Sequence, residues 1–126
     1  MKSVIKEATR LASNMWDADA KDVIGNKCRK KNVIQAKRML IYYLYNFVEV
    51  GHGHMKNHIK DLSHATSIHH VRKFNQELDE CAETKQTFKR FMDEMKSFSI
   101  YGDEFDELVK EMEQIKVKLK SIKNEN

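Results

Sequence analysis

The stretch from residue 33 to residue 48 constrains the fold of this chain more than any other part of the sequence. Its apolar residues recur at helical spacing but cover more than one side of the helix that they predict. They are Val33, Ile34, Ala36, Met39, Leu40, Ile41, Tyr43, Leu44 and Phe47. A helix that is apolar around much of its circumference has to be enclosed, so we expect a central helix surrounded by the rest of the chain. We expect Tyr42, Tyr43 and Tyr45 to pack in this core or at its boundary rather than to stack on bases.

The composition favours helices throughout the chain. Its 126 residues include no proline and only four glycines, whereas Lys, Glu, Met, Leu and Ile are abundant. The length fits one domain that buries roughly two-thirds of its unfolded surface. We therefore predict an all-α fold. The expected helices cover residues 3–14, a short segment capped by Asp17 or Asp19 and ending at Gly25, then 33–48, 55–60, 63–79, a segment around 88–95, and 103–122.

The sequence carries no signal for a membrane or for secretion. No stretch approaches the ~18 apolar residues that a membrane span requires, and the first residues lack the apolar core of a signal peptide. Cys28 and Cys81 lie far apart without metal-type spacing, which is typical of free thiols in a reducing compartment. We therefore expect a cytoplasmic protein with no membrane partner and no cofactor.

The charge is distributed unevenly along the chain, although the net charge is only +4. Residues 1–26 are neutral, residues 27–73 carry ten Lys or Arg against two acidic residues, and residues 74–126 carry nine basic against thirteen acidic residues. A basic middle part between a neutral and an acidic part predicts a surface for a polyanion on the middle part alone. The alternative is an ordinary solvated surface.

A helix-turn-helix pattern lies inside this basic part. Ser63 is a good N-cap, and apolar residues follow it at helical spacing. The first turns of this helix carry the candidate base-contacting residues, which are Ser63, His64, Ala65, Thr66, Ser67 and His69. Most of these side chains both donate and accept hydrogen bonds. A short amphipathic segment over 55–60 precedes the helix, with a tight connection at Asp61 and Leu62, which is the layout that places a second helix in the major groove.

Clustered cations upstream provide candidate contacts to phosphates. They are Arg29, Lys30 and Lys31 before the central helix, and Lys37 and Arg38 on it. No acidic residue lies near the first three in sequence, and their clustering becomes favourable when each one neutralises a phosphate and releases counterions. At the start of the helix over 55–60, the backbone N–H groups at Gly53 and His54 would point at a further phosphate.

Two stretches of the sequence carry a family resemblance. The first is Arg29-Lys30-Lys31-Asn32-Val33-Ile34-Gln35-Ala36-Lys37-Arg38-Met39, followed by Tyr43-Leu44, and the second is His64-Ala65-Thr66-Ser67-Ile68-His69-His70-Val71-Arg72-Lys73. Together they resemble the C-terminal DNA-binding domain of the replication initiator DnaA, with its basic loop and its signature Asp-His-Ser/Thr/Ala-Thr-Val-x-His-Ala. The resemblance covers roughly residues 4–95 and implies a helix-turn-helix bundle of that type.

The resemblance also implies roles for individual residues. It assigns the minor groove to Arg29, phosphates to Lys30, Lys31 and Arg38, base edges in the major groove to His64, Ala65 and Thr66, and a position one turn further to His69. Ala65 would offer its methyl group to a thymine methyl. The chain departs from the family where Ser63 replaces Asp, which implies that a contact to a cytosine amino group would be lost, and where Leu62 replaces Arg.

The ATPase part of the initiator has no counterpart in this sequence. No Gly-x-x-x-x-Gly-Lys-Ser/Thr motif occurs, so we expect a stand-alone DNA-binding domain that binds double-stranded DNA and no nucleotide. Its expected role is the control of replication or transcription of its own genome or of a mobile element. We expect residues 1–98 to form the DnaA-like domain and residues 99–126 a C-terminal helix. The heptad spacing over 103–122 favours a hairpin with the preceding helix or a homodimer.

Two alternatives to DNA binding follow from other features. All six histidines fall between residues 52 and 70, and His54 and His58 could share a helix face as metal ligands. No cysteine lies near them, and we expect no metal site. No nucleophile and base stand out as a pair, so we expect no enzyme. A helical interaction protein that works through residues 103–122 is the second alternative, and it is compatible with DNA binding.

Overall fold

A computed structural model describes residues 2–25 and 28–98 of the chain. Every regular element within these residues is a helix, which confirms the predicted all-α fold. The chain divides into two compact units, Met1–Met92 and Asp93–Asn126, and the packing described below is that of the first unit. The division predicted after residue 98 coincides with the end of the described residues and stays a prediction.

The first two helices follow the amphipathic pattern of the sequence. α1 (Lys2–Met15) buries Ala8, Leu11 and Ala12, which recur at helical spacing along one face. α2 (Ala20–Ile24) is capped by Asp19, whose carboxylate accepts a hydrogen bond from the N–H of Lys21 at 3.0 Å. These two helices therefore form where the sequence predicts them.

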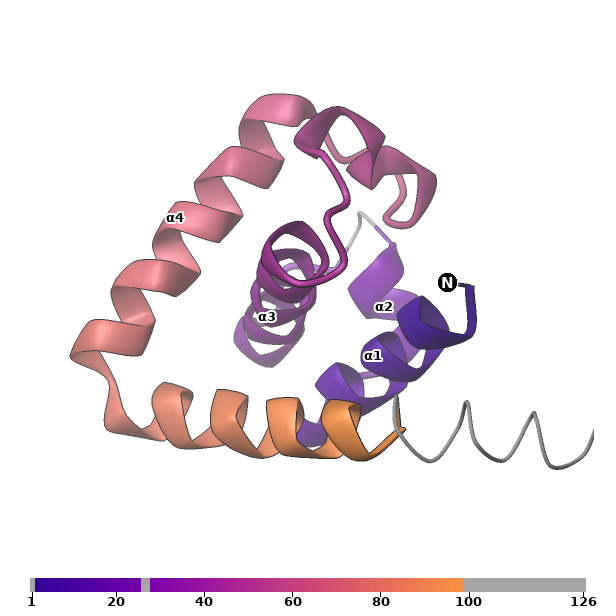
Figure 1. Cartoon of the computed structure of the whole chain (residues 1–126). Helices are drawn as coiled ribbons and strands as arrows, with labels where there is room; N and C mark the ends of the chain where they lie inside the picture. Colours follow the sequence, from indigo (N-terminus) through magenta and orange to yellow (C-terminus); the bar gives the residue numbers. More distant parts are fainter. Residues whose placement is uncertain (1, 26–27, 99–126) are drawn as a thin grey trace, which may run out of the picture. The chain divides into compact units, whose positions relative to one another are not determined.

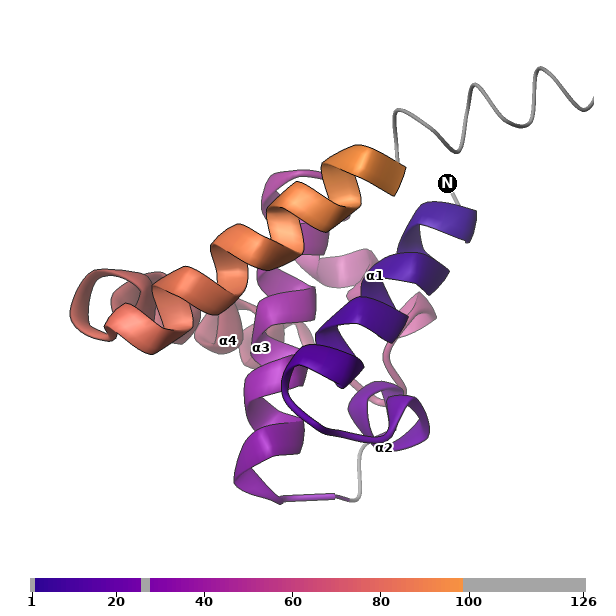
Figure 2. The same ribbon diagram turned by 90° about the horizontal axis from the view of Figure 1, so that it is seen from below.

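α3 (Lys31–Asn46) is the central helix that its apolar pattern predicts. Figure 1 shows it end-on, with α4 on one side and α1 and α2 on the other, and Figure 2 shows the same arrangement from below. Its buried apolar residues are Val33, Ala36, Met39, Leu40, Ile41, Tyr43 and Leu44. The helix begins two residues before the predicted start, and the side chain of Asn32 donates to the carbonyl of Asp17 at 2.8 Å.

The segment before the next long helix differs from the prediction. η1 (His52–Asn57) is a 3-10 helix, whereas the sequence predicts an α-helix over 55–60. Gly51 precedes it and Gly53 lies within it, and glycine disfavours an α-helix, so the chain forms a short, tight helix here instead. Met55 and Ile59 are buried and fix the segment to the core.

α4 (His64–Glu80) matches the predicted helix within one residue at each end. Ser63 is its N-cap and Cys81 follows its last residue, so the predicted break near residue 80 is confirmed. Residues 82–98 are again helical. No described helix is both long and apolar enough to span a membrane. The predicted helix over 103–122 and its dimer seam lie outside the described residues.

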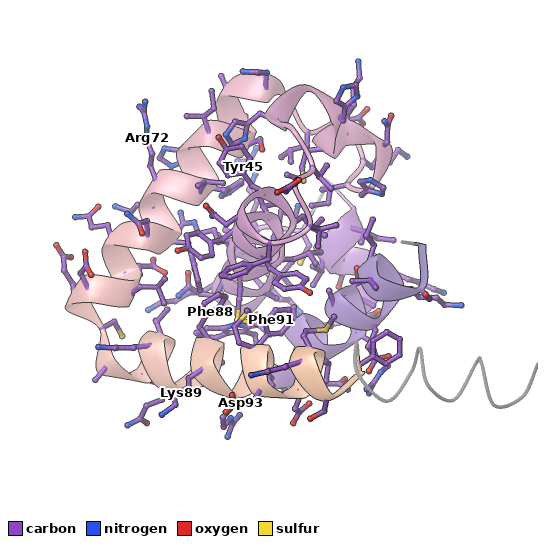
Figure 3. The ribbon with its side chains drawn as sticks, viewed as in Figure 1. Tyr45, Arg72, Phe88, Lys89, Phe91 and Asp93 are labelled. Carbon is purple, nitrogen blue, oxygen red and sulfur yellow. The ribbon has the colours of Figure 1, made fainter. Side chains whose placement is uncertain are left out.

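Aromatic rings join α3, α4 and the helical residues 82–92. The ring of Tyr42 lies 5.1 Å from that of Phe74 and 5.3 Å from that of Phe88, and the ring of Tyr43 lies 5.0 Å from that of Phe91. Figure 3 shows Phe88 and Phe91 pointing toward α3. Rings at such spacings stabilise a core beyond their buried area. Tyr43 is buried and Tyr42 half-buried, so the prediction that these two pack in the core or at its boundary is confirmed, whereas Tyr45, for which the same was predicted, is 38% exposed.

Candidate nucleic-acid interface

The N-terminal end of α4 is fixed by its own cap. The hydroxyl of Ser63 accepts the N–H of Thr66 at 3.1 Å and donates its proton to Oγ1 of Thr66 at 2.7 Å. Both bonds are local, so the Ser63 side chain holds the first turn rather than reaching outward. The hydroxyl proton of Thr66 is left to donate to an acceptor outside the protein, since its oxygen already accepts from Ser63.

One face of α4 is exposed and carries polar and basic side chains. Its members lie one helical turn apart in sequence: Ala65, Thr66, His69, Arg72 and Lys73, with His64 at the N-terminal end. Figure 3 shows Arg72 pointing away from the helix. Arg72 and Lys73 were not among the residues selected from the sequence, although their spacing of three and four residues from His69 places them on the same face. We call these six residues the exposed face of α4.

Ser67 does not belong to the exposed face, contrary to the assignment made from the sequence. Its side chain is fully buried, and its hydroxyl shares a hydrogen bond of 2.7 Å with Nδ1 of His52 on η1. Ser67 lies seven residues before the buried Phe74, so both occupy the inner side of the helix. The hydroxyl therefore joins η1 to α4 and cannot reach a base.

Lys37 and Arg38 also point into the protein rather than to its surface. Lys37 is 8% exposed, and its ammonium donates to the carbonyl of Gly25 at 2.6 Å. Burial lowers the pKa of Lys37, while the nearby Cys28 raises it. Arg38 pairs with Glu77 on α4 at 3.1 Å. Since the central helix is enclosed, its polar side chains bond to neighbouring elements, and neither cation lies on the surface to which it was assigned.

Arg29, Lys30 and Lys31 are exposed at the start of α3, where the sequence predicts them. Lys37, on the helix that follows this segment, contributes one of the positive charges that lower the pKa of His70 on α4. No acidic residue lies in the sequence between Asp61 and Glu77, so the exposed face of α4 carries only neutral and basic side chains.

His70 lies on the side of α4 that faces α3. Its Nδ1 accepts a hydrogen bond from Nε of Arg38 at 3.4 Å. Burial, followed by the positive charges of Arg38, His69 and Lys37, lowers the pKa of His70 to about 4. The ring is therefore neutral at physiological pH, and it acts as an acceptor that helps to orient Arg38.

The predicted phosphate contact at His54 is not supported by the backbone geometry. The N–H of His54 donates to the carbonyl of Gly51 at 2.9 Å, inside the first turn of η1, and is not free for a ligand. The imidazole of His54 is exposed. Within the described residues, no three His, Cys, Asp or Glu side chains come together as candidate metal ligands.

The fold and this surface define an all-α unit whose capped helix presents a polar, basic face to solvent. No protein-family model matches the chain. Over 86 residues, 68% of this chain, it is 26% identical to the chromosomal replication initiator protein DnaA of Flavobacterium psychrophilum. The matched part covers 17% of the length of that relative. The chain is thus similar to a short part of that initiator.

Proposed function

We propose that this protein binds double-stranded DNA in a sequence-dependent manner and acts in the control of replication or transcription. The observation that carries the proposal is the exposed face of α4. A helix whose first turn is fixed by Ser63, and whose outer side offers His64, Ala65 and Thr66, suits insertion into a major groove. The similarity to a replication initiator supports the same reading.

Base readout in this proposal is assigned to the first turn of α4 and to Arg29. Thr66 donates to a base acceptor, Ala65 contacts a thymine methyl, and His64 hydrogen-bonds a base edge. Arg29, which is exposed ahead of α3, enters the adjacent minor groove. Replacing His64 or Arg29 by Ala should weaken binding to the preferred duplex by about 1–3 kcal/mol. An equal loss on all duplexes would contradict this assignment.

Phosphate contacts are assigned to the exposed cations that flank the readout residues. They are Lys30 and Lys31 at the start of α3 and Arg72 and Lys73 on α4, while Lys37 and Arg38 are excluded because they bond inside the protein. Together with Arg29, these give five charges that DNA can neutralise. The logarithm of the affinity should then fall against the logarithm of salt concentration with a slope of roughly −4 to −5.

Selection of duplexes from a random pool, followed by fluorescence anisotropy over a salt series, tests the proposal. Arg72→Ala should make the slope of log affinity against log salt concentration shallower by about 0.9, the contribution of one phosphate contact. Lys89→Ala is the matched control, because Lys89 is an exposed cation on the helical residues 82–92, away from α4 (Figure 3). A response that is flat in salt, or an equal effect of both variants, would refute the proposed surface.

A further inference from the structure

We propose that His52 is a positioning residue, which holds His64 in place and thereby sets the base preference at the N-terminal end of α4. The inference rests on the proposed DNA-binding function, because the direction of His64 matters only if α4 faces DNA. His52 is not part of the exposed face of α4 and is not among the DNA-contacting residues selected from the sequence. It lies on η1, and its ring contacts residues of both α3 and α4.

Two contacts fix the His52 ring. Nδ1 of His52 shares a hydrogen bond of 2.7 Å with the hydroxyl of Ser67, which is fully buried on α4. The ring also stacks on Tyr45 of α3, with 4.0 Å between the ring centres and an angle of 15° between the planes. The hydrogen bond fixes the rotation of the imidazole, and the stack fixes its plane. His52 therefore has one orientation with respect to the first turns of α4.

The fixed ring in turn borders His64. The ring centres of His52 and His64 lie 5.6 Å apart at an angle of 67°, which is an edge-to-face contact. The contact with His52 thus limits the rotamers of an exposed side chain that would otherwise sample several. A side chain that is restricted before binding loses less entropy on the DNA, and it favours the bases that its fixed direction can reach.

The pKa of His52 is affected by His64, as expected for two imidazoles in contact. Burial is the main cause that lowers the pKa of His52, and the neighbouring His64 lowers it further. Both causes favour the neutral form of the His52 ring. A neutral ring with Nδ1 bonded to Ser67 is suited to orient a neighbour rather than to bind a phosphate itself.

The test compares His52→Phe, which keeps a ring on Tyr45 but removes the bond to Ser67, with His58→Phe on the same segment as a control. Binding is measured to the preferred duplex and to duplexes changed at one base pair. His52→Phe should reduce the preference for the original base pair roughly fivefold, the equivalent of one net hydrogen bond at about 1 kcal/mol. In the background of His64→Ala, it should have no further effect on this preference. Melting followed by circular dichroism confirms that each variant is folded.

A measurement without DNA provides a second readout. In an NMR titration, His64→Ala should raise the pKa of His52 part of the way toward its ordinary value, because one of the two lowering causes is removed. An unchanged pKa of His52 would overturn the proposed contact. If the native chain binds DNA selectively but His52→Phe keeps its base preference, the positioning role fails and the proposed function stands. If the native chain binds no duplex, both fail.

Discussion

Arg38 on α3 donates a hydrogen bond from Nη1 to Oε1 of Glu77 on α4 across 3.1 Å. The second carboxylate oxygen of Glu77 is buried and has no hydrogen-bond partner among the described residues. The pair is partly shielded from water, with side-chain exposures of 18% and 23%. The guanidinium is thus the group that compensates the charge of Glu77, and it is a link between two helices rather than a contact to DNA.

Arg38→Ala should therefore destabilise the fold by about 1–3 kcal/mol, because it leaves a partly buried carboxylate without its partner. The double variant Arg38→Ala, Glu77→Ala should be less destabilised than the sum of the two single variants. Urea unfolding followed by circular dichroism measures both. Arg72→Ala serves as the control and should change the unfolding free energy by less than about 0.5 kcal/mol. Equal effects of Arg38→Ala and Arg72→Ala would argue against the link.

The stability of the fold should decrease in mild acid because of His70. Its folded-state pKa of about 4 lies below the ordinary value of 6.5, so the unfolded chain takes up a proton first as the pH falls. The contribution of the neutral ring is complete above pH 6.5 and is lost progressively toward pH 4, with a slope of at most about 1.4 kcal/mol per pH unit. His70→Gln keeps an acceptor for Arg38 and removes the titration. Urea unfolding at several pH values should show a shallower dependence in this variant, and an identical dependence would contradict the buried state of His70.

Replacing either of two residues with left-handed backbone conformations by glycine should stabilise the fold. Glu49 has φ 64° and Asp61 has φ 56°, a region that strains residues with a Cβ atom. Glu49→Gly should stabilise the fold by roughly 0.5–1 kcal/mol, and Asp61→Gly by less, because Asp tolerates this region better. Lys60→Gly is the control next to Asp61, where φ is not positive, and it should destabilise. Thermal melting would contradict the assignment if all three variants shifted in the same direction.

At the N-terminal cap of α4, we expect Ser63 to contribute to stability and Thr66 to contribute to DNA binding. Ser63→Ala should destabilise the fold by about 1 kcal/mol, because the N–H of Thr66 loses its acceptor, whereas Ser63→Asp should keep the cap. Thr66→Val keeps the backbone bond and removes the outward hydroxyl together with the side-chain bond that it accepts from Ser63, whose exposed hydroxyl can donate to water instead. It should therefore lower DNA affinity with little change in melting temperature. Anisotropy and melting on the same samples make the comparison, and loss of stability without loss of affinity in Thr66→Val would contradict the role given to Thr66.

The sequence was sufficient to predict the fold class, the position of α3 at the centre and the cap at Ser63. Each of these depends on local chemistry, namely on apolar spacing or on a side chain that bonds to its own backbone. The 3-10 geometry of η1 is not predicted, because the sequence predicts a helix only from residue 55 onward, whereas Gly53 lies inside the short helix. Glycine disfavours an α-helix but is compatible with a tighter turn.

The candidate site was predicted less completely, for a reason that α3 illustrates. Lys37 was assigned to the surface from its charge, and Arg38 from its charge and the family resemblance, although a helix apolar on several sides leaves few positions that face water. The same apolar pattern that predicts a central helix also implies that cations on this helix are enclosed and bond to groups inside the protein. Ser67 carries a similar signal, since it lies seven residues before Phe74 and hence on the same side of α4. His52 had no such signal, because its contacts to Tyr45 and Ser67 arise only in the folded chain.

Two adjacent carbonyls at the end of α2 are held by different elements. Ile24 accepts from the N–H of Lys60, before α4, at 2.8 Å, and Gly25 accepts from the ammonium of Lys37 on α3 at 2.6 Å. Because the two carbonyls are consecutive in the chain, the end of α2 joins the turn before α4 to α3 at a single point. A substitution that displaces this end would therefore disturb both connections together.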